Sequence, residues 1–251
     1  MSEKLETIPV NDAFDSGDEC PFCYLRRKAE QSTLRYVAGP GASYMEPDVR
    51  AATDELGFCR EHLQALYDYG NTLGSALMLQ TYYARVLNEL QTELDRFEPP
   101  AKRTLFGRKK TEDAAEPYWK RLERKNGGCF LCNRIDYHMD RYYSTFFYLL
   151  KDAAFREKLA HSKGFCLPHF AGLLKRAETD LPNGQRDWFY PTLFRVTGEN
   201  LNRVKEDLDW LIAKFDYRNA GADWKNSQDA LPRAMEKLRG GHPADEPFRQ
   251  K

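Results

Sequence analysis

The stretch Cys20-Pro-Phe-Cys23 recurs 109 residues later as Cys129-Phe-Leu-Cys132. A second stretch, Gly57-Phe-Cys-Arg-Glu-His62, recurs 107 residues later as Gly164-Phe-Cys-Leu-Pro-His169. All six cysteines of the chain fall in these four motifs. Two motifs that both recur at nearly the same offset indicate an internal duplication.

The spacing of these residues is that of metal ligands. Two cysteines separated by two residues can wrap one ion in a tight turn, and a cysteine and a histidine three apart on a first helical turn point the same way. Three sulfurs and one imidazole nitrogen make the tetrahedral set of a structural zinc site, and soft thiolates argue against calcium or magnesium. We therefore expect two zinc ions per chain. The expected ligands are Cys20, Cys23, Cys59 and His62 in the first copy, and Cys129, Cys132, Cys166 and His169 in the second.

Other uses of the cysteines stay open. A Cys-Pro-Phe-Cys pair is also a redox motif, although no strand–helix alternation surrounds it here. A disulfide framework suits a short secreted chain better than one of 251 residues. An iron–sulfur cluster can use three cysteines and one histidine, but two copies of a four-ligand set favour zinc over another metal.

Composition excludes several classes of protein. Lys and Arg number 38, as do Asp and Glu, so the formal net charge is zero and nucleic acid is not an expected partner. The opening residues MSEKLETIPVND lack the apolar segment of a secretion signal. No run of 18 apolar residues predicts a transmembrane segment. With reduced thiols, these features predict a cytoplasmic protein.

Hydrophobic periodicity predicts a mainly α fold of two pseudo-repeated helical halves, each held by one Cys3His zinc site. One long helix is expected over residues 62–97, with a buried stripe that packs against a final long helix of the second half. The stripe of the first helix is Leu73, Ala76, Tyr83, Leu87, Leu90, Leu94 and Phe97, and that of the second is Leu201, Val204, Leu208, Leu211 and Phe215. The predicted domains are 1–100, a linker at 101–116, and 117–251, which ends in a docking segment where Trp224, Leu231, Met235 and Leu238 face the core.

The motifs also resemble those of a bacterial family of uncharacterised proteins, found mostly in Firmicutes. The resemblance rests on the duplicated boxes, the N-terminal IPVNDAF and the C-terminal KFDYRNAGADWKNSQDALPRAMEKLRG, and it covers nearly the whole chain. All eight Cys and His ligands match the family's pattern. The resemblance implies a bacterial intracellular protein and brings no activity with it.

No catalytic motif is visible, neither a GxGxxG, a P-loop nor an HExxH. Each expected zinc site has four protein ligands and leaves no position for water. Glu61 lies beside the ligand His62, but Pro168 takes its place in the second copy. These features favour a zinc-binding interaction or regulatory module with a protein partner. The alternative is a zinc-thiolate redox sensor or thiol oxidoreductase that uses the Cys20–Cys23 pair.

Overall fold

The computed structural model describes residues 6–41, 43–97 and 116–249. Within these ranges the regular structure is helical and contains no strand, which confirms the mainly α prediction. None of the described helices is long and apolar enough to cross a membrane. The α-helices are α1 (Thr7–Asp15), α2 (Pro21–Ala38), α3 (Pro47–Leu56), α4 (Arg60–Tyr69), α5 (Thr72–Arg96), α6 (Tyr118–Asn126), α7 (Phe130–Leu149), α8 (Ala153–His161), α9 (Leu167–Asp180), α10 (Arg186–Ala213) and α11 (Ala230–Arg239).

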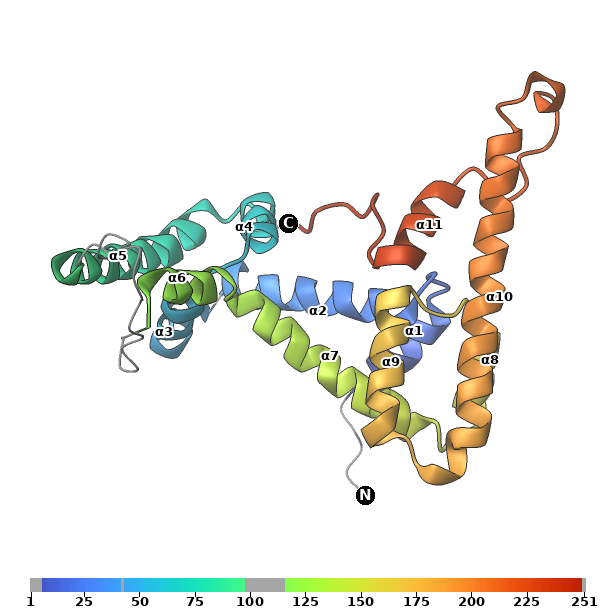
Figure 1. Ribbon diagram of the computed structural model, residues 1–251, viewed down its shortest axis with the longest axis horizontal. Coiled ribbons are helices and arrows are strands. Elements are labelled where there is room, and N and C mark those ends of the chain that lie inside the picture. The colour runs from blue at the N-terminus through green and yellow to red at the C-terminus, as the bar shows by residue number, and fades with distance from the viewer. Residues whose placement is uncertain (1–5, 42, 98–115, 250–251) are drawn as a thin grey trace, which may run out of the picture. The chain divides into compact units, whose positions relative to one another are not determined.

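The chain forms two compact units that interleave along the sequence (Figure 1). Unit 1 comprises Met1–Gln31 and Ile135–Glu246, and unit 2 comprises Ser32–Arg134 and Pro247–Lys251. These units differ from the consecutive domains 1–100 and 117–251 that the duplication suggested. Helices α2 and α7 each contribute residues to both units. The expected linker, 101–116, lies outside the described residues except for its last residue.

Unit 1 has an aromatic core. Six fully buried phenylalanines pack here in edge-to-face pairs, an arrangement that adds favourable quadrupole contacts to the burial of apolar area. They are Phe22, Phe146, Phe147, Phe155, Phe165 and Phe189. Two of these rings, Phe22 and Phe165, lie within the cysteine motifs themselves, so the core of unit 1 is built directly against them.

Unit 2 has a smaller core. Its buried residues come from the second half of α2, from α3 to α5 and from the start of α7. They are Leu34, Val37, Ala38, Val49, Leu66, Tyr69, Met78, Cys129, Phe130 and Leu131. Here too the core includes residues of a cysteine motif.

The predicted long helix over residues 62–97 is two helices. Helix α4 ends at Gly70, which adopts the left-handed conformation with φ 92°, and α5 begins after Asn71, whose side chain accepts a hydrogen bond from the Gly74 N–H. A glycine that ends one helix and an asparagine that caps the next are recognised stop and start signals. The dipeptide Gly70-Asn71 therefore marks the boundary between the two helices. The apolar periodicity continues across this boundary, which is why a single helix was predicted.

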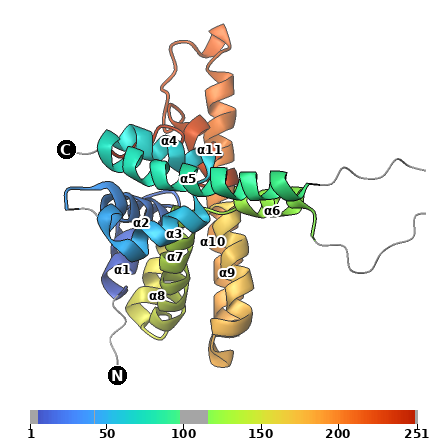
Figure 2. The ribbon, with the colours of Figure 1, turned by 90° about the vertical axis from the view of Figure 1, so that its left-hand side faces the viewer.

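The apolar stripe of α5 is exposed, contrary to the prediction that it would be buried. Exposed fractions range from 48% at Leu90 to 67% at Leu73. Helix α5 instead contacts α3 and α4 through its opposite side, where Gly74 and Met78 are buried (Figure 2). Periodicity located the apolar face correctly but not the element that would cover it.

The C-terminal segment docks on unit 1 through the opposite face of α11 from the one expected. Helix α11 packs against α10 and α9 (Figure 1). Its buried residues are Ala230, Arg233, Glu236 and Lys237. The apolar side chains that were expected to face the core are exposed, namely Trp224, Leu231, Met235 and Leu238.

Candidate metal centres

The eight predicted ligands form two clusters, and within each cluster all four donor atoms lie within 4.8 Å of one another. The outer cluster consists of Cys20, Cys23, Cys166 and His169, and the inner cluster consists of Cys59, His62, Cys129 and Cys132. The names refer to sequence order, since the inner set lies between the two halves of the outer set. All outer ligands belong to unit 1 and all inner ligands to unit 2.

The predicted grouping of the ligands is therefore wrong, although the ligands themselves come together. Each Cys-x-x-Cys pair meets the Cys-x-x-His pair of the other copy. The local motif determines which two donors share a helix end, and the fold determines which two helix ends meet. The repeat unit in sequence is consequently not the unit that one metal ion would hold together.

Both clusters are built from the first turns of two helices. In the outer cluster Cys20 precedes α2, Cys166 is the N-cap residue of α9, and Cys23 and His169 follow on the first turns. The inner cluster uses α7 and α4 in the same way. Helix N-termini present unpaired N–H groups and a partial positive charge, both of which stabilise thiolates.

A bend with positive φ precedes each Cys-x-x-His motif. Gly57 has φ 61° and Gly164 has φ 72°, a region that favours glycine. Gly164 has no room for a side chain, since a Cβ would lie 2.9 Å from the Val196 carbonyl oxygen. At Gly57 a Cβ would lie 2.6 Å from the Tyr82 ring, which would have to move. The Gly-Phe-Cys sequence thus turns the chain sharply so that the cysteine begins a helix at the cluster.

The distances of the outer cluster match a tetrahedral zinc site. Bonds of about 2.3 Å to sulfur and about 2.0 Å to nitrogen place the sulfurs about 3.8 Å from each other and about 3.5 Å from the nitrogen. The Cys166 Sγ lies 3.8 Å from the Cys20 Sγ and 3.6 Å from the Cys23 Sγ. The His169 Nδ1 lies 3.5, 3.5 and 3.1 Å from the three sulfurs of Cys20, Cys23 and Cys166. A disulfide would require about 2.05 Å between two sulfurs.

The inner cluster has a similar geometry. The Cys59 and Cys132 sulfurs are 3.9 Å apart. The His62 Nδ1 lies 3.2 Å from the Cys59 Sγ, 3.2 Å from the Cys129 Sγ and 3.3 Å from the Cys132 Sγ. Both clusters therefore present three sulfurs and a Nδ1 to one central point.

The electrostatics of the outer cluster suit a cation. Burial and, to a smaller extent, the neighbouring Cys166 thiol raise the pKa of the Cys20 thiol to about 12. Burial, with a smaller effect of the Arg26 guanidinium, lowers the pKa of His169 to about 4, so the imidazole is neutral at pH 7 and able to ligate. A divalent cation at the centre reverses the cost of ionising the thiols because its charge stabilises each thiolate.

In the inner cluster one thiol is already acidic. Burial raises the pKa of the Cys129 thiol, but hydrogen bonds from His62 and from the backbone N–H groups of Cys132 and Cys59 outweigh it and lower the pKa to about 6. Burial and the charge of Cys129 in turn raise the pKa of Cys132 to about 12. Cys129 is thus the thiol that ionises more readily than Cys132, and a cation at the centre would favour ionisation of its neighbours.

The C-terminal segment closes the outer cluster. A Cβ on Gly240 would lie 3.6 Å from the sulfurs of both Cys23 and Cys166, so the backbone approaches them closely. The Gly241 N–H donates a hydrogen bond to the Cys23 sulfur, which favours the thiolate. Cys20 and Cys166 are fully buried and Cys23 is 5% exposed.

A buried lysine joins the two motifs of the outer cluster. The Lys237 ammonium donates to the carbonyl oxygens of Glu19 and Lys163, which precede the two motifs, and lies 3.2 Å from the Glu19 carboxylate. Glu19 also forms an ion pair with Arg203 at 2.6 Å. No local sequence pattern points to Lys237, because its partners lie 218 and 74 residues away.

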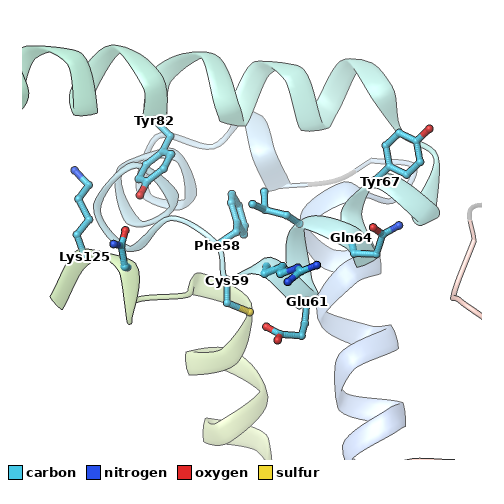
Figure 3. Close-up of a pocket in the computed structure, with 10 residues that line it drawn as sticks. Phe58, Cys59, Glu61, Gln64, Tyr67, Tyr82 and Lys125 are labelled. Carbon is cyan, nitrogen blue, oxygen red and sulfur yellow. The ribbon is translucent and has the colours of Figure 1, made fainter. Parts of the chain in front are cut away.

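The inner cluster is partly open to solvent. Cys59 and Cys132 are half-buried. An open pocket of about 640 Å³ lies beside Cys59, and its lining includes Phe58, Tyr82 and Lys125 (Figure 3). Figure 3 also shows the Glu61 carboxylate turned towards the Cys59 sulfur. A hydrogen bond from its own backbone N–H and, to a smaller extent, one from the Cys59 thiol lower the pKa of this exposed carboxyl.

Comparisons with known proteins identify a family and no characterised relative. A family model described as "Family of unknown function (DUF6062)" matches residues 1–245. No curated protein and no solved structure matches the chain. The family model therefore covers nearly the whole sequence and brings no known activity with it.

Proposed function

Because this chain belongs to DUF6062, a family of unknown function, we propose its role from the clusters themselves: it binds two zinc ions as structural cross-links of a helical interaction or regulatory module. The tetrahedral spacing of three sulfurs and one Nδ1 in each cluster supports this most strongly. Each set has four protein ligands, which argues for structural sites and against a catalytic one. Thiolate ligation also requires a reducing compartment, and we place the protein in the cytoplasm.

Zinc content and chelation test this proposal. We expect purified protein to hold about two zinc ions per chain by elemental analysis. Thermal unfolding can be monitored by circular dichroism, and a strong chelator should abolish its cooperative transition. The reason is that the binding free energy of structural zinc contributes directly to the free energy of folding. Restoring zinc, but not magnesium, should recover the transition. A protein that purifies with fewer than one zinc and keeps its unfolding transition in chelator would contradict the proposal.

A second candidate function, oxidant sensing, is favoured by the exposure of the inner cluster. The Cys20–Cys23 pair, which the sequence suggested for redox chemistry, is buried. The half-buried Cys59 and Cys132 have sulfurs 3.9 Å apart and are the better pair. Hydrogen peroxide would take two electrons from these thiolates and two protons from solvent, leaving a disulfide, two water molecules and a released zinc ion.

The two clusters should differ in their reactivity. We expect peroxide to release the zinc ion of the inner cluster at least about 10-fold faster than that of the outer cluster, because exposed thiolates are oxidised faster than buried ones. Release can be followed with a chromogenic zinc chelator, and the new disulfide by peptide mapping. The mapped bond should join Cys59 to Cys132, and a thiol reductant should restore zinc binding. Release of both ions at one rate, or a first disulfide at Cys20 and Cys23, would rule out sensing at the inner cluster.

A further inference from the structure

We propose that the exposed apolar face of α5 is the interface of a symmetric dimer, in which a second copy of this chain covers the face with its own α5. The inference is independent of zinc binding. It assigns one occupant to the face and rests on four properties of α5: the register of its apolar residues, the use of its opposite face, its charge and its area.

The register is that of a coiled-coil seam. Exposed residues at alternating steps of three and four run along the whole helix, as at the a and d positions of a heptad repeat. They are Leu73, Ala76, Gln80, Tyr83, Leu87, Leu90, Leu94 and Phe97. The single polar member, Gln80, carries no charge. Such a seam packs best against another helix of matching period, and α5 itself has that period.

The unit to which α5 belongs does not use this face. Met78 and Gly74 are buried on the opposite side. On that side Thr81 donates to the Asp54 carboxylate at 2.6 Å, and Glu89 forms an ion pair with Lys125 of α6. At the edge of the apolar face, Glu93 forms an ion pair with Arg121 of α6. The helix is thus attached to its own unit through Met78 and these polar contacts, and the apolar stripe is left outward. A helix that only stabilised its own unit would have the reverse pattern.

The charge of the face suits a like partner. No Asp, Glu, Lys or Arg stands at the a, d or e positions from residue 73 to 97. The one charged residue at a flanking g position, Glu93, is already paired with Arg121 of its own chain. A strongly acidic or basic partner would find nothing complementary here. A second copy can approach with no like charges opposed, which is the condition for an interface in which one patch meets itself.

The area is adequate. The six large side chains of the stripe are 48–67% exposed, which amounts to about 700 Å² on each copy, close to the roughly 800 Å² that each partner contributes to a standard interface. Leaving this stripe in water would be unusual for a monomer, because contiguous exposed apolar patches of this size mark interaction sites.

Light scattering coupled to size exclusion tests the proposal on the full-length protein with its zinc. We expect wild type to elute with the mass of two chains, and Leu87→Glu to elute as a monomer with a dimer dissociation constant raised at least about 100-fold, since the charge falls in the centre of the seam. The matched control is Asn88→Glu, which places the same charge on the neighbouring exposed position outside the seam. It should remain a dimer.

Zinc content and helicity of Leu87→Glu should match wild type, because Leu87 is 60% exposed and supports no core. A wild-type protein that stays monomeric up to several hundred micromolar would overturn the proposal. A dimer that survives Leu87→Glu would show that another surface mediates it. If Asn88→Glu dissociated the dimer to the same extent, the effect would come from the added charge in general. That result would also contradict a dimer interface at the apolar face of α5.

Discussion

Replacing Cys23 and Cys166 together should remove one zinc ion per chain, whereas replacing Cys23 and Cys59 together should remove two. The first pair belongs to one cluster and the second pair to both clusters. If each copy of the duplicated motifs held its own ion, the two results would be exchanged. The two serine double variants therefore distinguish the crossed arrangement from the consecutive one by zinc stoichiometry alone.

The expected effect is large because each ion contributes an apparent binding free energy on the order of 10–16 kcal/mol to the fold of its unit. Elemental analysis of folded protein gives the stoichiometry, and each single serine variant provides a control that should lose one ion. Amide hydrogen exchange should then show loss of protection in unit 1 for the Cys23 and Cys166 double variant, with unit 2 protected. Two zinc ions lost from that variant would contradict the crossed arrangement.

The eight clustered Cys and His residues could be predicted from sequence, but their grouping could not, because the entropy of loop closure hardly distinguishes the two groupings. Cys23 is separated from Cys59 by 35 residues and from Cys166 by 142. Closing the longer loop costs only about 1 kcal/mol more than closing the shorter one, because loop entropy grows with the logarithm of length. Because this difference in loop-closure free energy is small, side-chain packing determines which two motifs meet. The aromatic core brings Phe22 within 6.0 Å of the Phe165 ring, and with these rings come the cysteines beside them.

The exposed stripe of α5 shows a second limit of sequence patterns. Alternating steps of three and four located a helix and its apolar face, but they are the same for a face that is buried within the chain and for one that another chain covers. Helix α11 shows the opposite behaviour. Its Arg233 and Lys237 are buried against acidic partners. Its large apolar residues Leu231, Met235 and Leu238 are exposed. Hydrophobicity alone assigns such a helix the wrong side.

Replacing Lys237 with methionine should lower the free energy of unfolding of unit 1 by about 3 kcal/mol, because two carbonyl oxygens lose their buried donor and the Glu19 carboxylate keeps Arg203 but loses a buried cation. Lys237 is 1% exposed, and its ammonium joins the carbonyl oxygens that precede both outer motifs. The outer zinc ion should also leave to a chelator at least about 10-fold faster, while the inner ion is unaffected. Lys205→Met is the matched control, since it breaks an exposed pair with Asp209 and should change stability by less than about 1 kcal/mol.

A comparison of the two units explains why a lysine is needed in only one of them. In unit 2 the two motifs touch directly, with the Phe130 N–H donating to the Gly57 carbonyl at 2.9 Å and Gly128 leaving no room for a Cβ against the Leu56 carbonyl. In unit 1 the residue equivalent to Phe130 is Pro21, which has no N–H to donate. The Lys237 ammonium links the two motifs of unit 1 by another route, through the carbonyl oxygens of Glu19 and Lys163. If Lys237→Met and Lys205→Met had equal effects on unfolding and on zinc release, this bridging role would be excluded.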